Sequence, residues 1–282
     1  MTTKTKTRMK TSDSAGNPVG TIELVLGFST LESRLSGFKL PAPQTGRHIV
    51  LAVQSGNSAD VAFDFDALTA GRSDVTVIRL VGRGVTKSRN AVIEAAIELG
   101  AEYLIFGDDD VSFDEAGLQS AIDYFDAESK QDLLLGRVVD ETGALRKSYP
   151  AGFVTLSRFN SARAGTVEIM VRVAALASSG VRFDENFGAG AMPNFLGDEY
   201  IFICDLLAAR LAGTAVPFVF CSHPAESSGT DWQDRAALRA RSAVFARVFG
   251  AGAIFVRAGF AARKLGAGLR GSDYLRFVFN RF

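Results

Sequence analysis

The chain has 282 residues, of which 47% are hydrophobic and 22% charged, and its 31 basic residues equal its 31 acidic ones. This zero net charge gives no electrostatic reason for binding nucleic acid, so we expect no nucleic-acid partner. The length suits one large α/β domain or two small ones. The two cysteines, Cys204 and Cys221, are too few for a disulfide framework and suit a reducing, cytoplasmic compartment.

The first half of the middle region, 21–111, alternates apolar runs with helical segments, which predicts a parallel, doubly wound sheet. Strands are expected at 21–27, 48–53, 75–80 and 103–107. Helices are expected after Thr30, from the turn 54–60 to Ala70, and at 91–99, where the turn 82–90 opens the helix and Gly100 closes it.

In the second half, 112–232, strands and helices no longer alternate regularly. This pattern predicts a mixed and not a purely parallel arrangement of strands. We expect a helix from Asp114 to Ala127, a hairpin of 132–139 and 144–149, and a loop-rich segment at 180–197. A helix at 198–211 with Gly213 just past its end, a last strand at 216–221 and a helix at 232–249 complete the prediction.

The two ends of the chain differ in composition from this middle region. Residues 1–20 are polar, with scattered lysines and no apolar segment, which predicts a disordered leader and not a signal peptide. From residue 235 onward there are nine arginines and one lysine but a single acid, Asp273. This basic extension, 233–282, is predicted to be helical and to pack on the domain; the alternative is peripheral contact with the inner face of a membrane. No stretch looks long and apolar enough to span a bilayer.

The strongest functional signal is the run Asp108-Asp109-Asp110 directly after the apolar strand at 103–107. Carboxylates crowded at the edge of a core repel one another, so a bound cation is the natural reason to gather them. In a parallel sheet the carboxyl ends of the strands form the ligand-binding edge, and these acids lie at such an end. The alternative is a loop whose acids only face water, which the preceding Leu-Ile-Phe disfavours.

Five motifs follow one another in a specific order: Arg89-Asn90 opening a helix, the acidic run, the segment 183–188, Gly197-Asp198-Glu199, and His223 after a strand. Together they resemble the family 2 glycosyltransferases of the GT-A fold over about residues 21–232. The resemblance implies a Rossmann-type, mostly parallel sheet with a mixed acceptor-side half and helices on both faces. It divides the domain into a nucleotide-binding half, 21–111, and an acceptor half, 112–232.

The resemblance also implies a donor site for a nucleotide diphosphate sugar. Asp108 and Asp110 correspond to the family's Asp-x-Asp pair, which holds Mn²⁺ or Mg²⁺ on the diphosphate, and His223 corresponds to a histidine that completes the metal shell in some members. At the second strand tip the family usually has an Asp near the base, whereas this chain has Gln54; the base stays open, although an amide can pair with uracil. The residues expected to contact the nucleotide sugar are Phe28, Ser29, Thr30, Gln54, Arg89, Asp108 and Asp109.

In the same family an acidic pair at a helix start contains the general base, and Asp198-Glu199 matches it. One carboxylate would take the proton of the acceptor hydroxyl during inverting transfer. We favour Asp198 slightly, because it follows Gly197 at the helix mouth; the alternative for the pair is helix capping. Residues 224–232, which are small and polar, are expected to form a lid over the donor.

The sequence therefore predicts a metal-dependent, inverting glycosyltransferase that uses a UDP-linked sugar and a hydroxyl acceptor. The basic tail is compatible with polysaccharide or glycolipid synthesis, and a protein or small-molecule acceptor stays open. Two other functions remain: a sugar-phosphate nucleotidyltransferase, although residues 28–34 lack the Gly-rich basic loop typical of that class, and a non-catalytic nucleotide- or sugar-binding protein.

Overall fold

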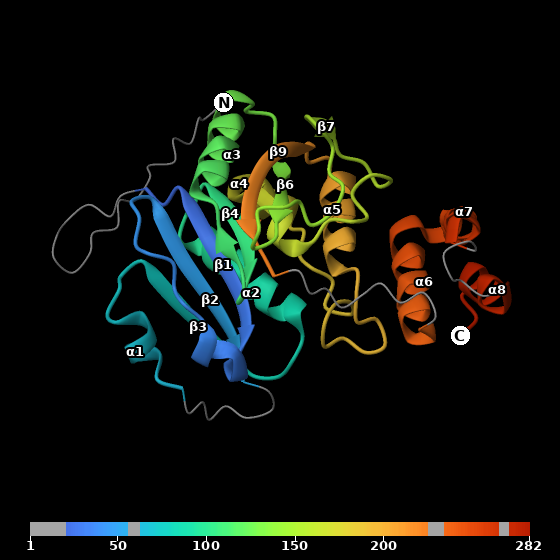
Figure 1. The fold of residues 1–282 in the computed structure, drawn as a ribbon, viewed down its shortest axis with the longest axis horizontal. Helices are drawn as coiled ribbons and strands as arrows, with labels where there is room; N and C mark the ends of the chain where they lie inside the picture. Colours follow the sequence, from blue (N-terminus) through green and yellow to red (C-terminus); the bar gives the residue numbers. More distant parts are fainter. Residues whose placement is uncertain (1–20, 56–62, 225–233, 265–270) are drawn as a thin grey trace, which may run out of the picture.

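The computed structural model describes residues 21–55, 63–224, 234–264 and 271–282 (Figure 1). The predicted leader, 1–20, and the predicted lid from residue 225 to 232 lie outside these ranges. The described residues form a mixed α/β domain around one nine-stranded sheet, with three further helices at its side.

The sheet has the strand order β3-β2-β1-β4-β8-β6-β9-β5, and β7 also pairs with β9. On one side β1 is parallel to β2 and β4, and β2 is parallel to β3. On the other side β8 is antiparallel to both β4 and β6, while β6 and β9 are parallel. The predicted parallel first half and mixed second half are both confirmed. The strands are β1 Leu24–Leu31, β2 Arg47–Gln54, β3 Val75–Leu80, β4 Tyr103–Asp108, β5 Ser112–Phe113, β6 Leu133–Val139, β7 Val154–Thr155, β8 Ile169–Arg172 and β9 Gly213–Ser222.

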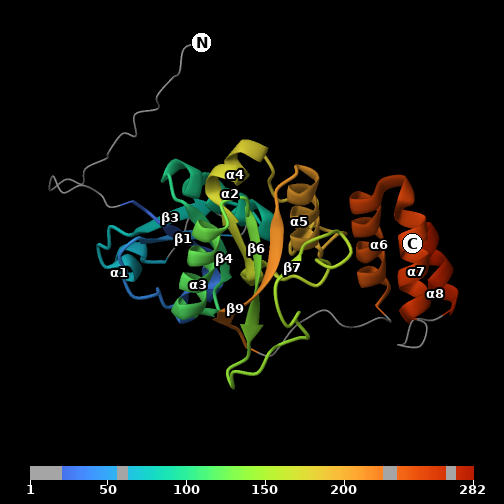
Figure 2. The ribbon, with the colours of Figure 1, turned by 90° about the horizontal axis from the view of Figure 1, so that it is seen from above.

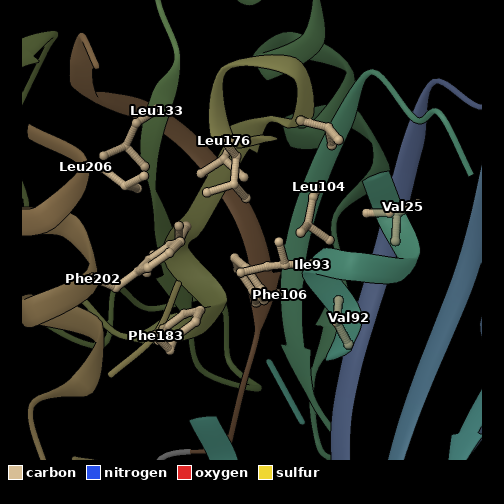
Figure 3. Close-up of a cluster of buried hydrophobic side chains, with 14 of the residues drawn as sticks. Val25, Val92, Ile93, Leu104, Phe106, Leu133, Leu176, Phe183, Phe202 and Leu206 are labelled. Atoms are coloured by element: carbon tan, nitrogen blue, oxygen red, sulfur yellow. The ribbon is translucent and has the colours of Figure 1, made fainter. Parts of the chain in front are cut away.

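Helices cover both faces of the sheet, as predicted, because side chains alternate along each buried strand. Val25 and Leu104 point to the face covered by α2, α4 and α5 (Figure 3), whereas Leu26 and Ile105 point to the face covered by α3. The α-helices are α1 Phe65–Thr69, α2 Val85–Glu98, α3 Glu115–Ala127, α4 Val173–Ser179, α5 Asp198–Ala208, α6 Arg235–Phe249, α7 Ala253–Lys264 and α8 Gly271–Phe279. The 3₁₀ turns are η1 Glu32–Gly37, η2 Thr166–Glu168 and η3 Gly250–Gly252.

One glycine lets the second helix approach the first strand closely. A Cβ atom on Gly27 of β1 would lie 2.2 Å from Cγ1 of Val92 on α2. Because real atoms do not approach so closely, any larger residue at position 27 would push α2 away from the sheet. The position of α2 matters for function, since this helix carries Arg89.

The predicted hairpin of 132–139 with 144–149 is confirmed at its first strand and its turn, and its second strand is wrong. The N–H of Asp140 donates to the carbonyl of Ala144 and the N–H of Arg146 to that of Val138, but residues 144–149 form only a bridge between Val139 and Leu145, and β6 pairs instead with β8 and β9. The reason is burial: Ile169, Met170 and Val171 of β8 are fully buried, so this short apolar run fills the central position between β4 and β6.

Two helix boundaries also differ from the predictions. Helix α2 begins at Val85 and not at residue 91, so Arg89 lies within its second turn and not before it. Helix α5 ends at Ala208, where Arg210 takes a positive φ of 67°, and Gly213 begins β9. A Cβ on Gly213 would meet Cδ1 of Leu156 at 2.9 Å, so this glycine serves strand packing and not a helix cap.

The helices α6, α7 and α8 form a group beside α5, away from β1–β3 (Figures 1 and 2). Val244 of α6 packs with Tyr200 and Ile201 of α5. The prediction that no stretch could span a bilayer differs from the structure, because the helical run Arg235–Lys264 of 30 residues could cross a membrane by length and composition alone. In the fold, η3 divides this run and α7 turns back along α6, with the rings of Phe245 and Phe260 at a centroid distance of 5.1 Å.

Candidate functional site

The carboxyl ends of three neighbouring parallel strands bring the predicted donor residues to one edge of the sheet. Ser29 of β1 is the register partner of Asp108 on β4, and Leu31 is the partner of Gln54 on β2. Thr30 lies between them on β1. Sequence segments that are far apart therefore meet at this edge, which is the ligand-binding edge of open α/β sheets.

A cavity of about 480 Å³ opens at this edge, beside the tips of β1 and β2. Gln54 forms part of its wall, and its Nε2 donates a hydrogen bond of 2.7 Å to the carbonyl oxygen of Gly84, which fixes the amide. A cavity of this volume falls within the range of small-molecule sites, roughly 300–1,000 Å³. The cavity is lined by Leu31, Glu32, Ser33, Gln54, Ser55, Phe63 and Arg83.

Phe28, Ser29 and Thr30 are not among the cavity-lining residues. The ring of Phe28 is buried in the core and packs edge-on against Phe38 at 5.2 Å and Phe113 at 5.5 Å. Ser29 and Thr30 are also buried. These three residues therefore pack inside the domain. Leu31 is the first residue of this strand end that lines the cavity.

The three acids of the run have different surroundings. Asp109 turns toward β1, where its Oδ2 accepts a 2.5 Å hydrogen bond from Oγ1 of Thr30 and its Oδ1 lies 3.3 Å from Nη1 of Arg34. Asp108 and Asp110 flank it. Burial raises the pKa of Asp108, Arg89 opposes the shift, and the negative charges of Glu199 and Asp110 add to it. Asp108 and Asp110 therefore lie close together, with fewer positive than negative side chains around them.

His223 follows β9 and faces the last acid of the run. Its Nε2 lies 3.4 Å from Oδ1 of Asp110, and its backbone N–H donates to the carbonyl of Val139. Within the described parts of the chain, no group of three or more His, Cys, Asp or Glu side chains forms a ready-made metal cluster. Asp108, Asp110 and His223 nevertheless supply the donor atoms that Mn²⁺ accepts, and an incomplete protein shell leaves positions for phosphate oxygens.

A buried arginine joins the acidic run to the acidic pair on α5. Arg89 is almost fully buried; its Nη1 pairs with Asp198 and lies 3.3 Å from Oε1 of Glu199, and its Nη2 lies 3.8 Å from Asp108. Burial lowers the pKa of Arg89, but these three carboxylates outweigh that effect and keep it protonated. Arg89 was predicted to contact the nucleotide; in the structure its hydrogen bonds and ion pairs go to carboxylates.

The two acids at the start of α5 differ in exposure and in the direction of their pKa shifts. The side chain of Asp198 is 4% exposed and that of Glu199 is 23% exposed. Gly188, with φ of 95°, lies over Asp198, and a Cβ there would meet its Cγ at 2.7 Å. Burial and the neighbouring charge of Glu199 raise the pKa of Asp198.

Glu199 has the opposite shift. Burial acts to raise its pKa, but the charge of Arg89, its own backbone N–H and the hydroxyl of Thr166 lower it overall. Oγ1 of Thr166 donates a 2.8 Å hydrogen bond to Oε1 of Glu199. Glu199 is therefore the more exposed member of the pair, and its pKa is shifted in the direction that favours the carboxylate form.

Asn90 holds the loop that covers Asp198. Its Nδ2 donates to the carbonyl of Phe183 at 3.0 Å, and its Oδ1 accepts from the backbone N–H of Phe183 at 2.8 Å. The ring of Phe183 stacks on Phe202 of α5 at 4.0 Å, and the N–H of Val85 donates to the carbonyl of Ala189. The predicted motifs on α2, in the segment 183–188 and on α5 are therefore directly connected in the fold.

Several residues of the site were missed by sequence reasoning. Leu31, Glu32 and Ser33 directly continue the predicted first tip, so extending that tip by three residues would have included them. Phe63, Arg83 and Thr166 had no such signal, because they come from turns whose position depends on the folded chain.

The sequence matches no protein-family profile and no curated protein. Solved structures do resemble the fold. The structure of S. aureus TarS 1-349 in complex with UDP-GlcNAc superposes with a TM-score of 0.58 at 14% identity, over 91% of this chain and 81% of that one. The structure of S. aureus TarS 1-349 in complex with UDP gives a TM-score of 0.56 at 16% identity, over 86% of this chain and 72% of that one.

A longer TarS structure gives a TM-score of 0.54 at 16% identity, and the match spans 89% of this chain but 44% of that one. At these identities the likeness concerns the fold. Together with the mixed nine-stranded sheet and its helices, it defines a GT-A-like fold for this chain.

Proposed function

We propose that this protein is a glycosyltransferase that transfers a sugar from a uridine diphosphate sugar to a hydroxyl group of an acceptor. One observation carries the proposal: the cavity at the tips of β1 and β2, the acidic run at the tip of β4 and the partly exposed Glu199 lie at one edge of the sheet. The fold supports it, because the similar TarS structures contain UDP or UDP-GlcNAc.

The nucleoside of the donor would occupy the cavity at the tips of β1 and β2. The fixed amide of Gln54 supplies both a donor and an acceptor group, which suits the edge of a uracil ring. Phe63 offers a ring face for stacking, and Arg83 adds a positive charge for the phosphates.

The diphosphate would lie along the acidic run with Mn²⁺ or Mg²⁺. Asp108 and Asp110 would hold the ion, with His223 as a further ligand. When bound, such an ion neutralises the charge that develops on the departing nucleotide. Arg34, whose guanidinium is exposed beside Asp109, can reach toward the same phosphates.

Glu199 is the proposed general base, instead of Asp198, which the sequence pattern slightly favoured. Its carboxylate is partly exposed and its pKa is lowered, which favours the form that can accept the proton of the acceptor hydroxyl. The acceptor oxygen then bonds to the anomeric carbon, the bond from that carbon to the nucleotide oxygen breaks, and the nucleotide leaves with the electron pair. Attack opposite the leaving group inverts the anomeric configuration.

Asp198 and Arg89 act as positioning residues in this proposal. Arg89 holds Glu199 in place and keeps it ionised, and Asp198 anchors Arg89 beneath the loop at Gly188. Neither group has the exposure that direct contact with an acceptor requires.

Calorimetric titration with UDP, UDP-GlcNAc and UTP, with and without Mn²⁺, tests the donor assignment. We expect a diphosphate to bind in the presence of Mn²⁺, and Asp110→Ala to weaken that binding about 10- to 100-fold. Asp123→Ala, which removes an exposed acid on α3, is the matched control and should bind like the unaltered chain.

Two outcomes would overturn the proposal. Preference for UTP over UDP and UDP-GlcNAc would favour the nucleotidyltransferase. Donor binding without hydrolysis or transfer, unchanged in Glu199→Gln, would favour a binding protein without catalysis.

A further inference from the structure

The outermost helices of the molecule, α7 and α8, each have one buried and one exposed side. On α7, Ala258 and Ala261 face the neighbouring helices, and on α8, Phe277 and Val278 do so. In both views these helices lie at the end of the molecule farthest from β2 and β3 (Figures 1 and 2). Their other sides therefore face away from the domain.

Those outward sides carry large apolar side chains. Leu275 and Phe279 follow each other at i, i+4 on α8 and are 58% and 50% exposed, and Phe282, which lies beyond the end of α8, is 37% exposed. Phe255 on α7 is 79% exposed. In the most apolar stretch of the helical run Arg235–Lys264, only 17% of the residues are buried. We call Phe255, Leu275, Phe279 and Phe282 the outer apolar set.

The charges around the outer apolar set have one sign. Arg263, Arg276 and Arg281 are exposed on the same two helices and the chain end. Arg281 lies over the ring of Phe279, with 5.9 Å between its Cζ and the ring centroid. The only acidic side chain in the sequence after residue 234 is Asp273, which is buried and paired with Arg235 at 3.1 Å. The described part of α7 and α8 therefore presents apolar and positive side chains without an exposed acidic one.

We propose that α7 and α8 bind the surface of an anionic lipid bilayer. The outer apolar set enters the boundary between headgroups and acyl chains, and Arg263, Arg276 and Arg281 reach the lipid phosphates. Charge complementarity selects this occupant over a second copy of the chain, because a second copy would place arginines against arginines. The helices lie on the membrane and do not cross it: α6 and α7 have 15 and 12 residues, fewer than the roughly 20 that span a bilayer.

Vesicle co-sedimentation with the full chain tests this. Vesicles of phosphatidylcholine alone should pellet little protein, and vesicles that also contain phosphatidylglycerol should pellet much more. High salt should weaken the binding, because exposed charges are screened. Each arginine near an anionic surface contributes roughly fivefold to the partition coefficient, so Arg276→Gln with Arg281→Gln should lower it about 25-fold.

Apolar substitutions separate insertion from simple charge attraction. Leu275→Ser with Phe279→Ser should lower partitioning at least about tenfold, because two exposed side chains lose their apolar area. The control is Phe153→Ser, since Phe153 is 53% exposed but packs with Tyr124 and Phe218 on the other side of the domain. It should bind vesicles like the unaltered chain. Unchanged far-UV circular dichroism would establish that each variant is folded.

Three results would overturn the proposal. The first is no difference between neutral and anionic vesicles. The second is equal binding by the Leu275/Phe279 variant and the unaltered chain. The third is self-association that the same variant abolishes, without vesicle binding, which would identify a second copy as the occupant.

Discussion

Two clusters of buried charge lie close together in this molecule and differ in their balance. At the sheet edge one guanidinium, Arg89, faces the carboxylates of Asp108, Asp198 and Glu199. On the far side of η2, the ammonium of Lys147 pairs with the single carboxylate of Glu168 at 2.6 Å. The hydroxyl of Tyr149 completes that second cluster with a 3.0 Å hydrogen bond to Glu168.

This difference in charge balance distinguishes a candidate functional site from a cluster that stabilises the fold. Lys147, Tyr149 and Glu168 pair with one another, tie the segment around 147–149 to η2 and line a second cavity of about 390 Å³. The Arg89 cluster has one guanidinium for three carboxylates, one of which, Asp108, belongs to the acidic run. Carboxylates that lie close together without enough positive partners repel one another. A bound cation or a transferred proton reduces this repulsion. The unbalanced cluster is therefore the candidate for chemistry.

Glu199→Gln is the change with the largest expected effect and tests the unbalanced cluster directly. An amide keeps the hydrogen bond from Thr166 but cannot accept a proton, so sugar transfer should fall about 10²- to 10⁴-fold, with donor binding nearly unchanged. Steady-state kinetics and donor titration on the same preparation measure both. Asp205→Asn, on the same helix but paired with Arg247 at the surface, should retain transfer. Full activity in Glu199→Gln would remove this residue as the base.

Arg89→Met should show the next largest effect, on stability. It leaves three carboxylates without their guanidinium, and breaking a buried pair in this way lowers the free energy of unfolding by about 3–5 kcal/mol. Lys147→Met is the matched change in the balanced cluster. It leaves the carboxylate of Glu168 without its cation but with the hydrogen bond from Tyr149. We therefore expect the free energy of unfolding to fall by about 2 kcal/mol. Urea denaturation measures both variants, and a larger loss in Lys147→Met would reverse the comparison.

The smallest effect concerns the pH dependence contributed by Glu168. Burial raises the pKa of its carboxyl above the ordinary value of 4.5, against the opposing charge of Lys147. Between pH 4.5 and the raised pKa, the folded chain holds this proton and the unfolded chain releases it, so the free energy of unfolding falls as the pH rises. Glu168→Gln lacks this titration. Its stability relative to the unaltered chain should increase across that window, and parallel pH curves would show that the pKa is not raised.

The local pattern of the chain was enough to predict the parallel half of the sheet, residues 21–111. Strands β1, β2 and β4 are buried apolar runs, a pattern typical of a parallel sheet with both faces covered, and β3 is the half-buried strand at the sheet edge. The second half was harder, because β8 has four residues and its place between β4 and β6 depends on partners distant in sequence. The mispredicted segment 144–149 had the turn chemistry of a hairpin but not the apolar side chains that compete for the core.

The site residues divide in the same way. The acidic run at a strand end, the acidic pair at a helix start and the glutamine at a strand tip were visible in the sequence, because strand ends and helix starts are local features. The ion pair of Arg89 with Asp198 spans 109 residues, and no local pattern encodes it. Phe63, Arg83 and Thr166 belong to the site for the same reason.

The sequence by itself determined the alternation of strands and helices, the position of the carboxylates at the ends of elements, and the excess of arginine at the C-terminal end. Each of these follows from the periodicity or composition of neighbouring residues. The tertiary structure alone decided which acid is exposed. The loop at Gly188 covers the side chain of Asp198 and leaves that of Glu199 partly exposed. Asn90 of α2 holds this loop through its hydrogen bonds to Phe183.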